Sequence, residues 1–262
     1  MLHELLLAFL GHTGDIFQIV PPSQSADKNG GIQQHPGTIQ LAPDIPLAEE
    51  AEKYRLNQLA AIGYDYLQLE LFVDREQDMV FSSLGSEGEQ LAKHLSVYRR
   101  AFATGVEEVL RTYRAAVLRL EQEIVRTPGC TPMPLTKVQL ILSDFFIILP
   151  QLHSLVRELL SRKLCGGALL QHLYDRATNG IPVLQSCIQR ILWHCNQVWY
   201  KQLIAWMIHG VLPSQNNEFL IVRSSANSAA SAASSAADAD STLEWHTGEP
   251  HPPKVPVTAT RP

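Results

Sequence analysis

Long apolar runs are absent from this 262-residue sequence. A membrane-spanning helix needs roughly 20 consecutive apolar residues, whereas the densest run, Phe145–Leu149, stops at Pro150. The apolar start, Met1–Leu10, is also short. Glu4 precedes most of it, no lysine or arginine does, and no small-residue cleavage site follows. We therefore expect neither a membrane partner nor a secretory signal.

Cysteine is scarce. The chain has four, Cys130, Cys165, Cys187 and Cys195, and no two form a C-x-x-C pair. So few cysteines in a chain of this length do not indicate a disulfide framework. Sparse thiols are typical of a reducing compartment, so we expect a cytoplasmic protein.

Charge is low as well. Charged residues make up 18% of the chain and the formal net charge is −5, which gives no global attraction to nucleic acid. Arg99, Arg100, Arg111 and Arg114 form a modest basic face, but glutamates lie among them. That mixture is typical of a solvated helix face, and we expect no nucleic-acid partner.

Motifs of catalysis are missing too. There is no G-x-S-x-G and no signature of a catalytic cysteine. Gly166-Gly167 and Asn29-Gly30-Gly31 lack the pattern of a phosphate-binding loop. The carboxylates Glu49, Glu50 and Glu52 sit where a helix should begin, and the helix dipole explains them. We expect no catalytic residue, no cofactor and no enzyme activity.

A zinc site is the alternative that the histidines and cysteines leave open. The candidates are His172, His194, His209, Cys165, Cys187 and Cys195. Cys187 and Cys195 are about two helical turns apart, too far for a tight pair of ligands, and no H-x-x-x-H exists. Buried cysteines and surface histidines account better for the pattern, so we expect no metal. Metal analysis of the purified protein tests the alternative, a helical zinc protein.

Helical periodicity is what the sequence has in abundance. Residues Leu2–Leu10 predict a short amphipathic helix, and Ile16–Val20 a brief extended piece. From about Leu47 a helix is predicted, interrupted at residues 82–88. Its apolar face consists of Ala51, Tyr54, Ile62, Tyr66, Leu69 and Val73, with Leu59 beside it.

The clearest stripe comes next in the chain. Its apolar residues follow one another at steps of three and four: Leu91, Leu95, Tyr98, Phe102, Val106, Val109, Tyr113, Val117, Leu120 and Ile124. Thr127-Pro128-Gly129 ends this helix. Thr136 is then expected to cap a helix that continues to about Leu159, and Pro150 should kink it or split it in two.

Two helices complete the expected set. The first, Ala168–Ala177, should turn Leu169, Leu170, Leu173 and Tyr174 inward. The second runs from Pro182, which suits a first helical position, to about His209. Its apolar residues cover so much of its circumference that we expect it to be covered on several sides. Trp193, Trp199, Tyr200 and Trp206 on this helix suit either a buried core or a partner surface.

The expected architecture is all-α: stacked helical bundles of long amphipathic helices over residues 1–212, with a loop at about 21–46. Residues 224–241 are almost only Ser, Ala, Asn and Asp, and residues 248–262 are rich in Pro and Thr. Such segments bury too little apolar area to offset chain entropy. We therefore expect a disordered tail over residues 213–262.

Two segments resemble the γ-tubulin complex component family. Met1–Leu10, followed by Gly11 and Gly14–Phe17, is similar to the start of family members. Gly180–Gly210 resembles the first Grip motif of the family, and Tyr200–Gly210 is its most specific part. The resemblance extends over about residues 1–222. A generic helical tethering or adaptor module is the rival interpretation, and it leaves both matching segments unexplained.

The resemblance implies a structural subunit that contributes to microtubule nucleation. Members of the family act in the cytoplasm and cytoskeleton, at microtubule-organising centres, centrosomes and spindle poles. Their N-terminal half contacts neighbouring components laterally, and their C-terminal half holds γ-tubulin. Because this chain looks truncated after the first Grip motif, we expect contacts with other components. We expect γ-tubulin to be reached indirectly, or directly only in a full-length form.

Candidate interface residues follow from the two matching segments. They are His3, Leu5, Leu6, Phe9, Trp199, Tyr200, Lys201, Trp206 and His209, while Gly180, Pro182 and Gly210 have structural roles. If the first helix makes the lateral contact, aspartate at Leu5 or Leu6 should weaken association and leave the protein helical. Loss of the fold would instead assign both leucines to the core.

Overall fold

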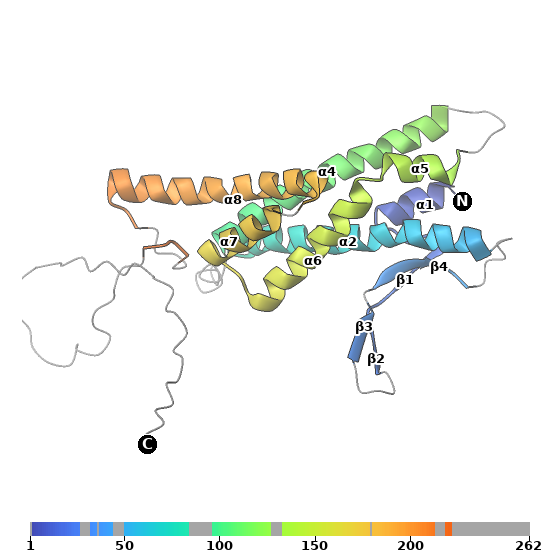
Figure 1. The fold of residues 1–262 in the computed structure, drawn as a ribbon, viewed down its shortest axis with the longest axis horizontal. Coiled ribbons are helices and arrows are strands. Elements are labelled where there is room, and N and C mark those ends of the chain that lie inside the picture. The colour runs from blue at the N-terminus through green and yellow to red at the C-terminus, as the bar shows by residue number, and fades with distance from the viewer. Residues whose placement is uncertain are drawn as a thin grey trace, which may run out of the picture.

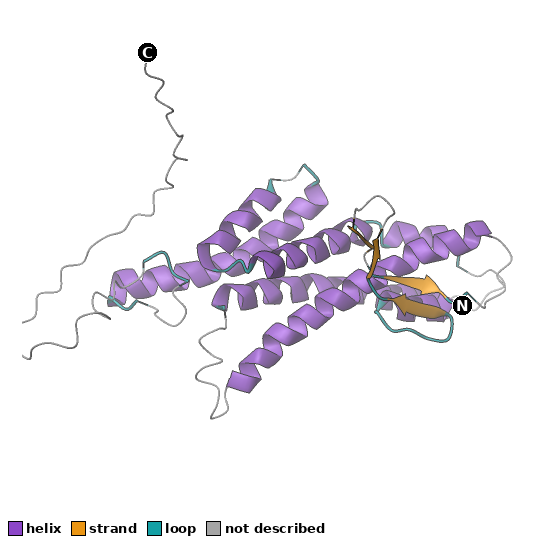
Figure 2. Cartoon of the chain, turned by 90° about the horizontal axis from the view of Figure 1, so that it is seen from below, coloured by secondary structure: helices purple, strands orange, loops and turns teal. Residues whose placement is uncertain are grey.

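The computed structural model describes residues 2–26, 32–35, 37–43, 50–83, 96–126, 133–178, 180–212 and 218–221 (Figure 1). The helices are α1 (Leu2–Phe9), α2 (Glu50–Ser83), α4 (Val97–Arg126), α5 (Leu135–Ile141), α6 (Phe145–Arg162), α7 (Gly166–Ala177) and α8 (Pro182–His209). Short strands are β1 (Phe17–Val20), β2 (Ser23–Ala26), β3 (Ile32–His35) and β4 (Thr38–Leu41). Helices dominate the fold (Figure 2), and the all-α prediction is confirmed.

The segment predicted to be a loop at 21–46 contains strands, so that prediction is wrong for its described part. β1 pairs antiparallel with β4, and β2 with β3. Phe17 and Ile39 are buried against the helices, and Asn57 Oδ1 of α2 accepts a hydrogen bond from the Leu41 amide at 2.8 Å. Each strand has only four residues, too few for a clear strand pattern in the sequence. The strand β4 is stabilised by its packing against α2, which the local sequence does not reveal.

The helix α2 begins its buried face later than predicted. Ala51 and Tyr54 are exposed, and burial starts at Leu56. Beyond that point the predicted face is confirmed. The buried apolar residues are Leu56, Leu59, Ala60, Ile62, Tyr64, Tyr66, Leu69, Phe72 and Val73. On α4 the predicted stripe is buried from Tyr98 to Leu120, with Ile124 half-buried. Leu91 and Leu95 lie outside the described residues.

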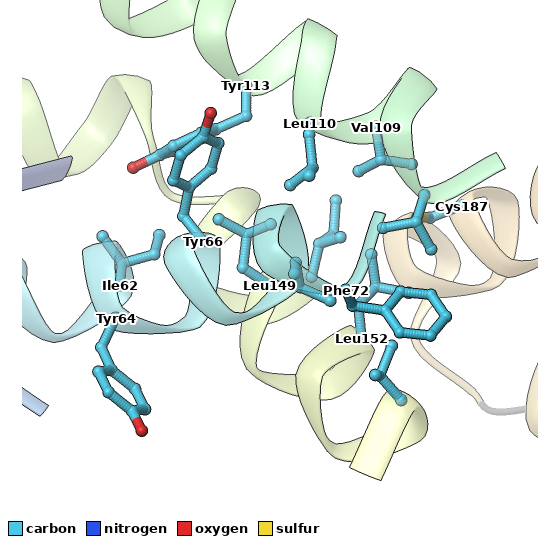
Figure 3. Close-up of a cluster of buried hydrophobic side chains, with 14 of the residues drawn as sticks. Ile62, Tyr64, Tyr66, Phe72, Val109, Leu110, Tyr113, Leu149, Leu152 and Cys187 are labelled. Carbon is cyan, nitrogen blue, oxygen red and sulfur yellow. The ribbon is translucent and has the colours of Figure 1, made fainter. Parts of the chain in front are cut away.

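An aromatic cluster joins α2, α4 and α6. Tyr66 of α2 and Tyr113 of α4 lie side by side (Figure 3), with ring centroids 5.3 Å apart. Phe145 of α6 meets the Tyr113 ring edge-on at 5.2 Å. The Tyr113 hydroxyl donates a hydrogen bond to the Phe9 carbonyl at 3.1 Å. Burial raises the pKa of Tyr113, so its hydroxyl stays protonated and remains a donor. This contact fixes the end of α1 against α4.

The helix expected around residues 136–159 is split in two, but not at Pro150. The break falls at residues 142–144, and α5 and α6 meet there at 57°. Pro150 lies inside α6 on its exposed side, where water can solvate the carbonyl that loses its partner. The break lets α5 bury Val138, and Leu142 in the break itself is also buried. Thr136 is not the cap, because α5 starts at Leu135 after Pro134.

Within the described residues, no single helix is long and apolar enough to cross a membrane. The bent pair formed by α5 and α6 reaches the required length and composition only when both helices are taken together.

The chain returns to the bundle after α8. Glu218 accepts a hydrogen bond from the Val97 amide at 3.1 Å, at the start of α4, and Phe219 is buried. Residues 218–221 therefore belong to the folded body, although the tail was expected to begin at 213. The other residues of the expected tail, 213–217 and 222–262, lie outside the described residues.

Candidate protein–protein interface

The helix α8 has the bounds that its sequence predicts. Pro182 occupies the first turn, and Gly210 ends the helix in the left-handed conformation at φ 64°. Glycine adopts that conformation without steric cost, which explains its place after the last turn. Gly180 is exposed just before the helix. Pro182 and Gly210 thus mark where α8 begins and ends.

The first half of α8 is buried against α4 and α7. Its core residues are Leu184, Cys187, Ile188, Ile191 and Cys195. A side chain added at Gly105 of α4 would place its Cβ 3.1 Å from Ile191 Cα. Gly105 therefore allows the two helices to cross at close range. This crossing holds the N-terminal half of α8 firmly in the bundle.

The second half of α8 carries an uncovered apolar stripe. Figures 1 and 2 show this half extending past the other helices. The stripe consists of Tyr200, Ile204, Met207, Ile208 and Val211, which are between 50% and 71% exposed. The spacing of i, i+4, i+7 and i+8 places Tyr200, Ile204, Met207 and Ile208 on one face of α8, and Val211 follows the end of the helix at Gly210. The prediction that α8 is covered on several sides is therefore wrong for this half within the described part of the chain.

The remaining candidates on α8 lie around this stripe. Trp199 and Trp206 are half-buried, and the Trp199 ring lies 5.1 Å from the Tyr200 ring. Lys201 and His209 are exposed. At about 100° of rotation per residue, Trp199, Trp206 and His209 point away from the stripe, and Lys201 lies at its edge. The five predicted α8 candidates are therefore spread around the helix and do not form one surface. The predicted candidates did not include Ile204, Met207, Ile208 or Val211, although the first three continue the helical spacing of Tyr200.

The candidates on α1 divide differently. Leu5, Leu6 and Phe9 are buried in the core against α2 and α4. Their selection as interface residues is wrong, because no partner can reach them in the folded chain. His3 is exposed, and so is Leu7 one turn later. The amphipathic pattern identified the buried face of α1 correctly, but that face meets the chain's own helices.

A polar cluster connects α4 and α8 next to their crossing at Gly105. Glu108 lies 2.6 Å from Arg190 Nη2 and 2.9 Å from His194 Nε2. The hydrogen bond to His194, with further help from Arg190, lowers the pKa of the Glu108 carboxyl. Trp193 lies beside this cluster at the rim of an open hollow. The cluster is a partly exposed clamp between the two helices.

Removing the Glu108 carboxylate should weaken the acid dependence of stability. A lowered pKa in the folded state contributes stability above the ordinary carboxyl pKa, and this contribution is lost as the pH falls through the folded value. The variant Glu108→Gln should therefore be less stable than the parent at neutral pH, and the difference should shrink below about pH 4. Urea denaturation across pH measures this. Glu121→Gln, an exposed glutamate of α4, is the control, and an equal pH trend in both variants would contradict the clamp.

The zinc candidates do not meet. Among the described residues, no group of three or more His, Cys, Asp or Glu side chains is placed to hold a metal ion. Cys187 and Cys195 are buried in the core, and burial raises the pKa of each thiol to about 12. His194 pairs with Glu108 on α4, whereas His172 lies 3.1 Å from Glu158 on α6. His209 is exposed at the far end of α8.

Comparison with known proteins shows which family this chain belongs to. Residues 2–248 match the family model described as gamma tubulin complex component N-terminal. The chain belongs to the γ-tubulin complex component family. The match extends beyond α8 and includes residues 218–221, in agreement with their packing at the start of α4.

Individual members of the γ-tubulin complex component family align over most of the chain. It is 36% identical over 261 residues to a gamma-tubulin complex component 4 homolog of Medicago truncatula, covering 95% of this chain and 34% of that protein. It is 34% identical over 238 residues to gamma-tubulin complex component 4 of Homo sapiens, covering 88% of this chain and 32% of that protein. The chain thus spans about a third of the length of the curated relatives that it matches.

Proposed function

We propose that this protein is a non-enzymatic structural subunit of the γ-tubulin complex, and that it contacts a neighbouring component through the apolar stripe of α8. The observation that supports this most is the row of exposed apolar side chains at Tyr200, Ile204, Met207, Ile208 and Val211. A soluble helix normally turns such a face toward a partner. Lys201, exposed at the edge of this row, suits the polar rim of an interface.

The spacing of the stripe indicates the geometry of its partner. Anchors at i, i+4, i+7 and i+8 are the pattern of a helix that lies in an apolar groove or against another helix. The first half of α8 is fixed by its crossing with α4, so its second half is presented as a rigid rod. A preorganised helix loses little conformational entropy on binding, which favours a stable contact.

Within the complex, this contact would place the chain beside another γ-tubulin complex component and so contribute to microtubule nucleation. The site of action would be the cytoplasm and cytoskeleton, at microtubule-organising centres, centrosomes and spindle poles. Contact with γ-tubulin would be made through the complex. Family membership supports this role, since the matching relatives are named as components of that complex.

The double variant Met207→Asp/Ile208→Asp tests the proposed contact. Two carboxylates in an apolar interface should cost at least about 2 kcal/mol, a loss of roughly 30-fold in affinity. Both side chains are exposed, so far-ultraviolet circular dichroism should stay helical. Affinity is measured by interferometry against purified neighbouring γ-tubulin complex components.

The control for this experiment is Leu140→Asp on α5. Leu140 is as exposed as Met207 but belongs to a helix remote from the end of α8 (Figure 1). Equal loss of affinity in Leu140→Asp and in the double variant would argue against the α8 stripe. Failure of the parent protein to bind any component of the complex would favour a tethering or adaptor module instead.

A further inference from the structure

The exposed face of α8 extends beyond the apolar stripe toward the middle of the helix. Trp193 precedes Tyr200 by seven residues, close to two full turns, so the two side chains lie on the same face. Trp193 is 57% exposed, which is similar to the exposure of Tyr200 and Ile204 in the stripe. From Trp193 to Ile208 this face is about 22 Å long, or four helical turns. A partner that covers it must therefore be longer than the stripe alone requires.

At Trp193 the exposed face meets an open hollow that α8 shares with α4. The volume of the hollow is about 770 Å³. Trp193 and Arg190 of α8 line one side of it, and Thr104 and Arg111 of α4 line the other. A helix that lies along the stripe would reach this hollow with its last turn. The surface available to a partner thus includes part of α4.

Positive side chains flank this surface along α4. Arg190 reaches across to Glu108 of α4, and Lys201 follows Arg190 by eleven residues, about three turns, so it lies on the same side of α8. On α4, Arg100 and Arg111 are also eleven residues apart and share a face. All four cations are exposed. The helix α8 contains no aspartate or glutamate.

The carboxylates of the same region already have donors within the protein. Glu108 belongs to the polar cluster between α4 and α8. Glu107 accepts a hydrogen bond from the side chain of Gln77 at 2.7 Å. The four exposed cations outnumber these two carboxylates. The surface is therefore locally positive, although the formal net charge of the chain is −5.

We propose that the partner of the α8 stripe is an amphipathic helix with carboxylates beside its apolar face. Its apolar side chains would cover the face from Trp193 to Ile208, and its carboxylates would pair with Arg111 and Lys201. This partner presupposes the contact proposed above and specifies its chemistry. Opposite charges at the rim would select the partner and fix its register more than they add affinity.

Two stapled helical peptides of about 20 residues, long enough to span four turns, test the charge preference. They share one leucine face and differ only in its flanks, which carry glutamates in one peptide and lysines in the other. Fluorescence anisotropy with the full chain measures both affinities. We expect the glutamate peptide to bind at least about 10-fold more tightly. Non-specific attraction would favour the lysine peptide, because the net charge of the chain is −5.

The double variant Arg111→Glu/Lys201→Glu should remove the preference for the glutamate peptide. Both side chains are exposed, so far-ultraviolet circular dichroism should remain unchanged. The matched control is Arg55→Glu/Arg119→Glu, which makes the same change in charge at two other exposed positions. Arg55 lies at the start of α2, and Arg119 lies about 21 Å along α4 from Gly105 at the crossing with α8. The control should keep the preference.

Trp193→Ala tests whether the contact extends to the hollow. Aromatic anchors carry a large share of the binding energy of protein interfaces, so the affinity for the glutamate peptide should fall roughly 10-fold. Tyr54→Ala removes an aromatic side chain that is 70% exposed on α2 and should leave that affinity unchanged.

A lysine peptide that binds as tightly as the glutamate peptide overturns the inference, and so does the absence of binding by both peptides. A preference that persists in Arg111→Glu/Lys201→Glu, or an affinity that Trp193→Ala leaves unchanged, has the same consequence. These outcomes differ from those that test the proposed function. If Met207→Asp/Ile208→Asp loses binding to the complex components while the peptides show no preference, the α8 contact stands and only its acidic partner is excluded.

Discussion

Replacing Gly63 with alanine is expected to separate α1 from α2. A Cβ at this position of α2 would lie 1.8 Å from the carbonyl oxygen of Ala8 and 3.2 Å from Ile39 Cδ1. The nearest obstacle is backbone, so no rotation of a side chain can relieve the clash. Overpacking of this kind costs about 1–3 kcal/mol or more. Both α1 and β4 should shift or detach.

Thermal unfolding followed by circular dichroism measures this loss. For a chain of this size, 1 kcal/mol corresponds to a shift of about 2–4 °C in Tm, so a drop of several degrees is expected. The sign of the change in Tm is informative, because replacing glycine with alanine inside a helix normally stabilises a protein by about 0.5–1 kcal/mol. A raised Tm in Gly63→Ala would contradict the close approach of the two helices.

Gly180→Ala is the matched control. Gly180 has no heavy atom within 4 Å of the position of an added Cβ. Its replacement should change stability by no more than about 0.5 kcal/mol, as for other surface positions. A similar loss in both variants would mean that the effect of Gly63 does not come from its contact with α1.

The long helices could be predicted from the sequence because their signals are redundant. The stripe of α4 repeats over eight turns, so a single misplaced residue changes little. For α8, Pro182 and Gly210 mark both ends through local backbone chemistry that does not depend on the rest of the fold. Such local signals can be recognised in the sequence without knowledge of tertiary contacts.

The strands and the break between α5 and α6 depend on distant contacts. β4 has four residues, and it is held by Phe17, by Asn57 and by the surface of α2. The break after Ile141 allows α5 to bury Val138 and places Leu142 of the break in the core, while Pro150 is accommodated at an exposed position. Neither β4 nor the break after Ile141 has a local sequence pattern that distinguishes it from the residues around it.

The candidate site shows the same limit most clearly. Periodicity reveals that a helix has an apolar face, but it does not tell which part of the chain or which partner covers that face. On α1 the apolar face meets α2 and α4, whereas on the second half of α8 it remains open in the described structure. The two faces look alike in sequence, but one packs in the core and the other is proposed to bind a partner.

A pair of substitutions on α1 separates these roles by experiment. Leu5 is 1% exposed and Leu7 is 43% exposed, and they are only two residues apart on the same helix. In Leu5→Asp a carboxylate would enter the core, and the cost should be at least about 3 kcal/mol, with loss of cooperative unfolding. In Leu7→Asp the carboxylate stays in water, so stability should change by less than about 0.5 kcal/mol.

Urea denaturation of both variants, followed by binding to neighbouring γ-tubulin complex components, gives the readout. If α1 were an interface helix, Leu5→Asp would fold normally and fail to bind. The packing of Leu5 against α2 and α4 predicts the reverse order: the fold is lost first, and binding only as a consequence. The variant Leu7→Asp tests whether the exposed face of α1 also binds a partner. If it folds and binds more weakly, His3 and Leu7 belong to a second contact. Unchanged binding would leave the stripe of α8 as the contact that the proposal requires.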